Sequence, residues 1–557
     1  MKSGVVLVGI YFVYATFHWT ARPQSESTRP RYVDVTGRSK FSYITNNGFT
    51  DRKYFPQPLC GGVAAFDFDN DGWLDIFFSN GAKFPELKKV NSSFYNALLR
   101  NKRDGTFEDV TQPAGLAGDH LGYSLGVAAG DFDNDGWVDL FIANAGANAL
   151  YRNNGNGSFQ DVSASSGLTK PDGVLSVQGA WLDFDNDGLL DLALSNYTVW
   201  TVETDRRCVR EDGVEFYCHP KTYPAVAQRL YRNLGKGKFV DVSDASGFAS
   251  VHGKGMGIGI ADVNNDGWTD VFVANDTERN FLYVNQKNGT FKEQGLLLSV
   301  AYNEDAMTVS AMGVDVKDFD NDGWPDIFYN DLMGQIWGLF RNVSGRTFRY
   351  VSATTRLLSL SASYSGWSGG FIDYDNDGWK DLFSANGDVD SLRKNAEQSE
   401  TMFQNIGGKS FLDVSRQMGA DFLNTGYKRG SAFGDFNNDG YLDIVVTALN
   451  RKPRILVNSG KGGGHWLMIE ATGSRSSRDA IGARIKVMTA SGRTLYNHVT
   501  TSVGFLSSSD RRVHFGLGAD TSAASVEITW PSGEIDSFRN VAANQTLRIK
   551  ERPQEAN

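Results

Sequence analysis

The sequence has 557 residues and a formal net charge of −10, and it contains 61 glycines, 36 phenylalanines, 21 tyrosines and 12 tryptophans. Abundant glycine and aromatic residues without long helical periodicity predict an all-β chain that is rich in turns. No concentrated basic face of the kind that nucleic-acid-binding proteins need occurs in the sequence, so we expect no nucleic-acid partner.

Residues 1–21 have the composition of a secretory signal peptide, with one lysine followed by an apolar run over 5–17. That run is shorter than the roughly 20 residues needed to span a bilayer, and it matches the apolar region of a signal peptide. We therefore expect a secreted, extracellular or periplasmic protein. An uncleaved N-terminal anchor is the alternative, and no other membrane span is predicted. Residues 22–30 are expected to form a linker.

An acidic nine-residue loop with the sequence DFDNDGWLD occupies residues 67–75. Asp67, Asp69 and Asp71 alternate, Gly72 permits a sharp turn, and Asp75 completes the loop. Positions 1, 3, 5, 7 (through a backbone carbonyl) and 9 of such a loop converge on one hard cation, and ligation by oxygen alone favours calcium. A solvated acidic turn is the alternative for a single copy.

The loop recurs six times, starting at residues 131, 183, 262, 318, 373 and 435. None of the seven has a glutamate at position 12, and short β-rich segments follow, so these are loops between strands and not helix–loop–helix calcium hands. We predict up to seven Ca²⁺ ions. The predicted ligands are Asp67, Asp69, Asp71, Trp73, Asp75, Asp131, Asp133, Asp135, Trp137, Asp139, Asp183, Asp185, Asp187, Leu189, Asp191, Asp262, Asn264, Asp266, Trp268, Asp270, Asp318, Asp320, Asp322, Trp324, Asp326, Asp373, Asp375, Asp377, Trp379, Asp381, Asp435, Asn437, Asp439, Tyr441 and Asp443.

The repeat unit is near 55 residues and contains four predicted strands, which is the blade of a β-propeller. The seventh unit lacks its last strand before the sequence changes at 460–464, and a matching segment, RYVDVT, lies at 31–36. Pairing of 31–36 into the seventh blade would close the ring and remove exposed strand edges. We predict a seven-bladed propeller over residues 31–460.

Two of the three cysteines, Cys208 and Cys218, flank a short insert within the third unit. In an exported protein they are expected to form a disulfide, leaving Cys60 unpaired or buried. A zinc site is not expected, because no further cysteine or histidine pair stands nearby.

The region 461–550 loses the repeat and is predicted to form a small β-sandwich-like domain, followed by a tail at 551–557. Its predicted strands are 465–471, 483–490, 493–501, 511–518, 525–531 and 545–551.

The DFDNDG units resemble FG-GAP or VCBS repeats, as in integrin α-subunit propellers. The segments SSRDAIGARI (476–485), HFGLG (514–518) and VEITWPSGE (526–534) resemble the ASPIC/UnbV module. Together these resemblances identify the chain as a member of the cartilage acidic protein family. The resemblance implies an extracytoplasmic, calcium-binding propeller whose animal members are matrix or secreted proteins. UnbV-type members also occur in natural-product gene neighbourhoods.

Function is expected on the face opposite the calcium loops, where the long insertions 81–95, 197–228 and 387–400 fall, because loops on a rigid scaffold usually carry binding sites. The prediction is a recognition or adhesion module for an unknown protein, glycan or small molecule. The alternative is a natural-product biosynthetic or other extracytoplasmic enzyme that uses the same face. A third possibility is a component of a surface assembly with the C-terminal module as its docking element.

For the enzyme alternative, His252 with Lys254 and Asp276 could form an acid–base group on that face, although an ordinary surface histidine is the simpler interpretation. A deep pocket that brings His252, Asp276 and Lys428 together would favour the enzyme. Two G-x-S-x-G sequences, at 122–126 and 366–370, would need a strand, a tight turn and a helix to act as a hydrolase elbow. Each leads instead into a predicted strand and a calcium loop, so no catalytic residue is assigned.

Overall fold

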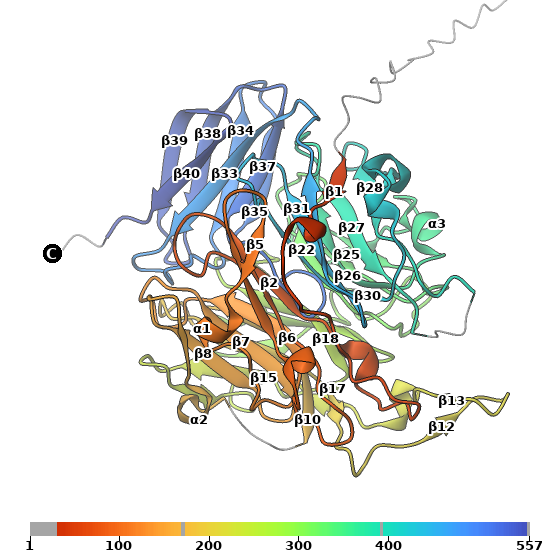
Figure 1. Cartoon of the computed structure of the whole chain (residues 1–557). Helices are drawn as coiled ribbons and strands as arrows, with labels where there is room; N and C mark the ends of the chain where they lie inside the picture. Colours follow the sequence, from red (N-terminus) through yellow and green to blue (C-terminus); the bar gives the residue numbers. More distant parts are fainter. Residues whose placement is uncertain (1–30, 169–172, 390–393, 554–557) are drawn as a thin grey trace, which may run out of the picture.

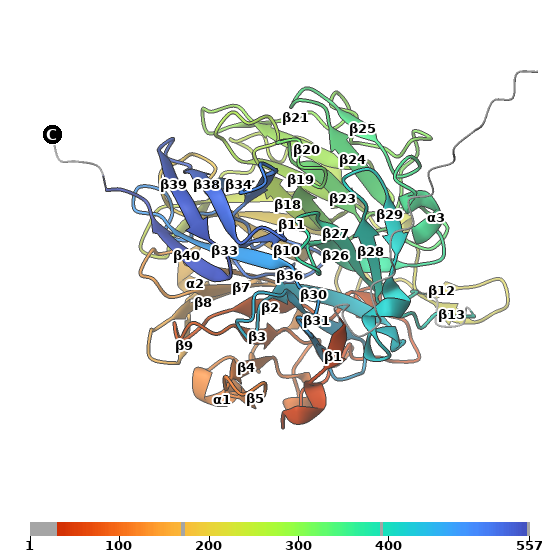
Figure 2. The same cartoon turned by 90° about the horizontal axis from the view of Figure 1, so that it is seen from above.

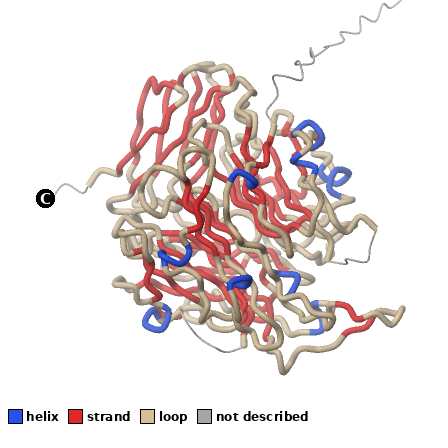
Figure 3. Tube along the Cα trace, viewed as in Figure 1, coloured by secondary structure: helices blue, strands red, loops and turns tan. Residues whose placement is uncertain are grey.

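A computed structural model describes residues 31–168, 173–389 and 394–553. Strands dominate this part of the chain, and the helices are short (Figure 3). The α-helices are α1 (Thr111–Ala114), α2 (Ser163–Ser166) and α3 (Leu357–Ser361). The 3-10 turns are η2 (Thr36–Arg38), η3 (Gln57–Leu59), η4 (Ser92–Phe94), η5 (Pro220–Thr222), η6 (Ser415–Met418) and η7 (Asp421–Leu423).

Seven antiparallel blades of four strands form a closed ring, which confirms the predicted all-β propeller. The first four blades are β2 (Val63–Phe66), β3 (Asp75–Phe78), β4 (Ala97–Asn101) and β5 (Phe107–Asp109); β6 (Tyr123–Gly130), β7 (Asp139–Ala145), β8 (Ala149–Asn153) and β9 (Phe159–Asp161); β10 (Val174–Leu182), β11 (Asp191–Val199), β15 (Arg229–Asn233) and β16 (Phe239–Asp241); β18 (Gly255–Ala261), β19 (Asp270–Asn275), β20 (Phe281–Asn285) and β21 (Phe291–Glu293).

The last three blades are β22 (Val314–Lys317), β23 (Asp326–Tyr329), β24 (Gly338–Asn342) and β25 (Phe348–Tyr350); β26 (Gly366–Ile372), β27 (Asp381–Asn386), β28 (Thr401–Asn405) and β29 (Phe411–Asp413); β30 (Lys428–Gly434), β31 (Asp443–Ala448), β32 (Arg454–Asn458) and β1 (Tyr32–Asp34). The first strand of every blade contacts the first strands of its two neighbours, so these seven strands surround the axis. Strands β2, β10, β18, β26 and β30 are labelled around the centre of Figure 2. Apolar side chains fill the space between neighbouring blades, as in the layer between blades one and two.

The strand that closes the ring comes from the N-terminal side, as the sequence predicts. Strand β1 pairs antiparallel with β32, with Tyr32 opposite Asn458. The Tyr32 side chain is buried against Phe422, and Asp34 forms an ion pair with Arg454 at 2.9 Å. The last blade therefore contains strands from both ends of the propeller sequence.

Deletion of residues 31–36 should lower the free energy of unfolding by about 3–5 kcal/mol, because a large buried side chain and a strand pairing are lost, and should promote aggregation through the exposed edge of β32. Thermal melting and size-exclusion chromatography measure both effects. Val33→Lys is the matched control, since Val33 is 40% exposed on the same strand. A monomeric deletion variant with unchanged melting would refute closure by this strand.

The C-terminal domain has a three-stranded and a four-stranded sheet, consistent with the predicted sandwich. Its strands are β33 (His465–Thr472), β37 (Val513–Gly518) and β40 (Gln545–Lys550) in one sheet, and β34 (Arg484–Thr489), β35 (Thr494–His498), β38 (Ser522–Thr529) and β39 (Ile535–Ala542) in the other. The sequence did not predict β39, because only two of its residues are buried and its apolar alternation is weak.

The segment 499–510, between β35 and β37, leaves the sandwich and enters the centre of the ring. We call it the channel segment. It contains β36 (Ser507–Ser508), which pairs in parallel with β2 and lies among the innermost strands in Figure 2. The Leu506 carbonyl accepts hydrogen bonds from the amides of Val63 and Val127. Gly504 and Val314 exchange two backbone hydrogen bonds of 2.7 and 3.1 Å.

Side-chain hydrogen bonds extend these contacts to the other four blades. The partners are Gln178 with the Leu506 amide, the Ile258 carbonyl with Ser502, Ser368 with the Phe505 amide, and the Ser431 amide with Ser507. The channel segment therefore bonds to the first strand, or the residue beside it, in all seven blades. Nothing in its sequence predicted this position.

Candidate metal sites and the two faces of the propeller

Each acidic loop is folded around its own aspartates. In the second loop, Asp131 accepts hydrogen bonds from the backbone amides of Asp135 and Gly136, at 3.0 and 2.8 Å. Asp139, at position 9, accepts hydrogen bonds from the backbone amides of Phe132 and of Asn153, which lies in the blade's third strand. The other six loops repeat this pattern. Glycine at position 6 has φ near +90°, which residues with a side chain rarely adopt.

The aspartate at position 3 gives the clearest test of whether the loops fit a cation. In the first loop, Asp69 pairs one oxygen with Arg100 at 2.7 Å, while its Oδ1 is buried without a hydrogen bond. The same Oδ1 is buried and unpaired in Asp185, Asp320 and Asp375. An unpaired buried carboxylate oxygen is costly, and a cation would remove that cost. The residues present therefore fit a bound cation.

Carboxylates of five loops approach closely enough to hold a metal ion, with their ligand oxygens within 4.8 Å of one another. These groups are Asp67, Asp69 and Asp71; Asp131, Asp133 and Asp139; Asp183, Asp185 and Asp191; Asp318, Asp320 and Asp326; and Asp373, Asp375 and Asp381. The loops at 262 and 435 carry Asn264 and Asn437 at position 3, so each offers one carboxylate fewer.

Burial changes the ionisation of these carboxyl groups. It raises the pKa of Asp131 and of Asp183 to about 7, and neighbouring aspartates add to the shift. It also raises the pKa of Asp67 and of Asp318 to about 6. Without a cation, several loop carboxyl groups therefore hold protons near neutral pH.

Asparagines that the sequence analysis did not assign join the loops into a ring. The side chain of Asn134, at position 4, donates to the Gly188 carbonyl of the next loop. Each of the seven loops makes this bond to its successor, and Asn438 closes the circle on Gly72. A second asparagine, at the end of each third strand, donates back to the preceding loop, as Asn153 does to Phe68. Both asparagines recur in all seven units, and this recurrence could have identified them from the sequence.

The C-terminal domain covers much of the acidic-loop face. Arg484 lies 3.3 Å from Asp262, and Arg493 donates to the Asp377 carbonyl. The Arg478 amide donates to Asn134, and Arg512 bonds to Asn438. In Figure 1 this domain, in blue, lies across the molecule from the yellow hairpin of β12 (Cys208–Val209) and β13 (Glu215–Phe216). The module that was considered as a docking element thus docks on its own propeller.

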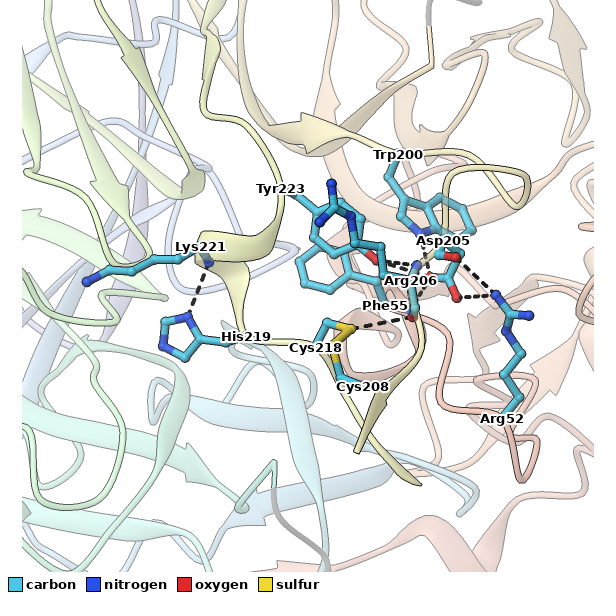
Figure 4. Close-up of a disulfide and its surroundings, with 10 residues drawn as sticks. All are labelled: Arg52, Phe55, Trp200, Asp205, Arg206, Cys208, Cys218, His219, Lys221 and Tyr223. Carbon is cyan, nitrogen blue, oxygen red and sulfur yellow. Dashed lines mark hydrogen bonds and ion pairs between the residues drawn. A yellow bond between two sulfur atoms is a disulfide. The ribbon is translucent and has the colours of Figure 1, made fainter. Parts of the chain in front are cut away.

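The opposite face carries the insertions, and one of them is cross-linked. Cys208 and Cys218 form the predicted disulfide, and Cys60 is buried and free. Asp205, in the same insertion, pairs with Arg52 at 3.0 Å and accepts a hydrogen bond from Trp200 (Figure 4). These bonds fix the insertion to the segment before the first blade. Two short strands, β14 (Val226–Ala227) and β17 (His252–Gly253), join its end to the next inter-blade segment.

The acid–base groups considered for the enzyme alternative are not assembled around the cavity. Lys428 is buried and pairs with Glu400 at 2.7 Å, and Lys254 pairs with Glu278 at 3.0 Å. His252 is exposed in β17. Only Asp276 lines a cavity, of about 400 Å³, on this face. Lys254 lies beside Asp276 through a backbone hydrogen bond, but the ammonium groups of Lys254 and Lys428 are each paired with a glutamate.

The serines of the two G-x-S-x-G sequences also lie outside any hydrolase elbow. Ser124 and Ser368 are buried within β6 and β26, and Ser368 bonds to the channel segment. Aromatic and apolar residues around the cavity, such as Tyr217 and Met312, were not singled out from the sequence. No pattern marked them, because they come from many separated segments of the chain.

Among the residues that the structure describes, no helix is long and apolar enough to cross a membrane. The N-terminal signal peptide or anchor, predicted at 1–21, and the linker at 22–30 lie outside the described residues.

Comparison with protein families finds three matching models. The FG-GAP-like repeat model matches residues 67–142, 131–194, 225–273, 262–329 and 318–384. The FG-GAP repeat model matches 429–463, and the ASPIC and UnbV model matches 473–556.

Relatives include cartilage acidic protein 1 of Mus musculus, which is 24% identical over 93% of this chain and 78% of its own length. The Xenopus tropicalis protein of the same name is 25% identical over 88% of this chain and 73% of its own length. Similar solved structures include an Agrocybe aegerita lectin that recognises non-reducing terminal N-acetylglucosamine, with 15% identity, a TM-score of 0.38, and coverage of 74% of this chain and 94% of the lectin. A Bacillus licheniformis rhamnogalacturonan lyase has 12% identity, a TM-score of 0.37, and coverage of 76% of this chain and 75% of the lyase.

Proposed function

Because this chain belongs to the FG-GAP-like repeat family and is related to cartilage acidic protein, we propose that it is an exported calcium-binding propeller that acts as a recognition or adhesion module. The observation that carries the proposal is the contrast between the two faces. One face is lined by acidic loops and covered by the C-terminal domain, while the other holds the insertions and an open cavity.

Calcium would be held by the aspartates, or asparagine, at positions 1, 3, 5 and 9 and the carbonyl at position 7 of each loop. The bound ion would supply positive charge that keeps these carboxylates ionised and close together. The backbone amides of each loop orient its carboxylates. The position-4 asparagines hold each loop against the next. This role is structural, because the loops lie away from the insertion face.

Recognition is assigned to the insertion face, where the partner would be a protein, a glycan or a small molecule. A disulfide and the Asp205 hydrogen bonds hold the largest insertion in place, and rigid loops lose less entropy on binding. Export is supported by the composition of residues 1–21 and by this disulfide, since disulfides persist in oxidising compartments.

The proposal is tested by blocking one face at a time. A single cysteine introduced at exposed Glu211, in the β12–β13 hairpin, or at exposed Ser537, in the C-terminal domain, is coupled to a bulky polymer. Buried Cys60 does not react. Binding to extracellular matrix from the source organism should require calcium and be lost only with the Glu211 conjugate. Equal binding by both conjugates would contradict recognition by the insertion face.

The calcium-dependent gain in melting temperature should be larger at about pH 8 than at about pH 5.5. In the calcium-free protein, burial raises the pKa of Asp131 to about 7 from its ordinary 3.8, so the folded state holds a proton that the unfolded chain has released. Stability without calcium therefore falls as pH rises from about 4 to about 7. Calcium removes that loss by stabilising the ionised form. Paired melting curves with and without the ion measure the gain, and a gain that does not change with pH would contradict the assignment.

A further inference from the structure

The cavity on the insertion face is a pocket whose floor and walls come from distant parts of the chain. Trp367, in β26, and Met312, just before β22, line it, and Phe505 of the channel segment packs against Trp367 with ring centres 5.3 Å apart. Phe216 and Tyr217, beside the disulfide, form part of its rim. We call this cavity the insertion-face pocket. Its volume, about 400 Å³, suits a small organic molecule.

One carboxylate oxygen in the pocket lacks a hydrogen bond. Asp276, directly after β19, is 8% exposed, and its Oδ2 accepts a hydrogen bond from the Tyr197 hydroxyl. Its Oδ1 is buried and has no hydrogen bond. Its backbone amide donates to the Lys254 carbonyl, which fixes the residue in position. His219, in the pocket lining, and Lys254 are the cationic side chains that act on Asp276, and the Lys254 ammonium is paired with Glu278.

The charge of the lining selects the charge of the ligand. The lining residues that the structure describes include two aspartates, Asp276 and Asp388, one histidine, His219, and no lysine or arginine. An anionic ligand would meet two carboxyl groups with His219 as the one titratable cationic partner among these residues, and burying it would be costly. A cation would instead be drawn into the pocket and would find a free carboxylate oxygen.

The apolar part of the lining indicates what the uncharged part of the ligand is like. Met256, Met312, Met333, Leu332 and Val389 present apolar and adaptable side chains. Polar side chains such as Ser310, Gln335 and Ser365 also line the pocket, but apolar surface predominates in its lining. An apolar or aromatic body with one polar head fits this distribution.

The insertion that forms the rim is held rigidly. In Figure 4 the disulfide lies next to His219, whose ring accepts a hydrogen bond from the Lys221 amide, and Phe55 packs beside Tyr223. Phe55 also stacks on Tyr197, at 5.3 Å between ring centres, and so supports the hydroxyl that bonds to Asp276. The pocket is therefore formed before any ligand enters it.

We propose that the insertion-face pocket binds a small organic cation, with a protonated amine donating to Oδ1 of Asp276 and an apolar or aromatic body against the methionines. This inference rests on the proposed role of the insertion face and names its ligand class.

The test uses three probes of similar shape and different charge: 2-phenylethylamine, 2-phenylethanol and 3-phenylpropanoate. Binding to the calcium-loaded full chain is followed by saturation-transfer NMR and titration calorimetry. The amine should bind at least about tenfold more tightly than the alcohol, which is the expected contribution of a charged hydrogen bond. The carboxylate should not bind at about 10 mM, a concentration that fills a millimolar site.

Two variants and one control locate the site. Asp276→Asn should remove the preference for the amine while keeping binding of the alcohol. Asp305→Asn, at an exposed aspartate on the same face, should leave the preference unchanged. Met333→Trp should fill the pocket and abolish binding of both probes, and it serves as the test if Asp276→Asn does not fold.

Failure of the amine to bind, or amine binding that survives both variants, would overturn the proposal, as would tighter binding of the carboxylate. Matrix binding and calcium content are measured on the same preparations. If they remain while the amine does not bind, only the ligand class is wrong and the recognition module stands.

Discussion

Removal of calcium should lower the melting temperature of the mature protein by about 20 °C. A ligand at a hundred times its dissociation constant stabilises the folded state by about 2.7 kcal/mol, and up to seven sites act together. For a propeller of this size, each kcal/mol corresponds to roughly 1–2 °C. The buried, unpaired Oδ1 atoms of the position-3 aspartates give the physical reason, because chelation leaves them without any partner. Scanning calorimetry with calcium and after chelation measures the shift, and elemental analysis counts the ions.

Single substitutions distinguish calcium binding by the loops from a general effect of acidic residues. Asp133→Ala should lose about one ion per chain and part of the calcium-dependent stabilisation, because Asp133 lies in one of the five close groups of carboxylates. Asp305→Asn removes an exposed aspartate outside the loops and should change neither quantity. Unchanged melting after chelation, or the same ion count in Asp133→Ala, would show that the loops are acidic turns only.

Leu506→Asp should lower the free energy of unfolding by more than about 4 kcal/mol, because it places an uncompensated charge in a fully buried position. Leu506 is 0% exposed, and the backbone on either side of it bonds to several blades. Leu296→Asp is the matched control, since Leu296 is 66% exposed on the propeller surface and should tolerate the charge. Chemical denaturation measures both variants.

Hydrogen exchange tests where this instability arises. The amides of Val63 and Val127, which donate to the Leu506 carbonyl, should exchange faster in Leu506→Asp. The amides of β33 and β37, which pair within the sandwich, should be less affected. Uniform protection in the variant, with normal melting, would mean that the channel segment does not hold the blades together.

The sequence predicted the parts of this protein that depend on local spacing. The seven acidic loops, the four-stranded unit and the disulfide over a short insert all follow from residues close together in the chain. The missing strand of the seventh blade also indicated its partner, because strand edges in a closed ring must be paired and 31–36 matched the gap.

Tertiary structure alone decided where the non-repeating residues lie. The sequence VTTSVGFLSSSD of the channel segment has no periodicity, and its hydrogen-bond partners are first strands far away in the chain. Lys428 could not be excluded from the ligand face by sequence, since the buried Glu400 that pairs with it is on another blade. The insertion-face pocket likewise exists only because separate segments converge on Asp276. Short-range patterns thus determine the loops and blades, whereas packing between distant segments determines which charges are neutralised and which remain open to a ligand.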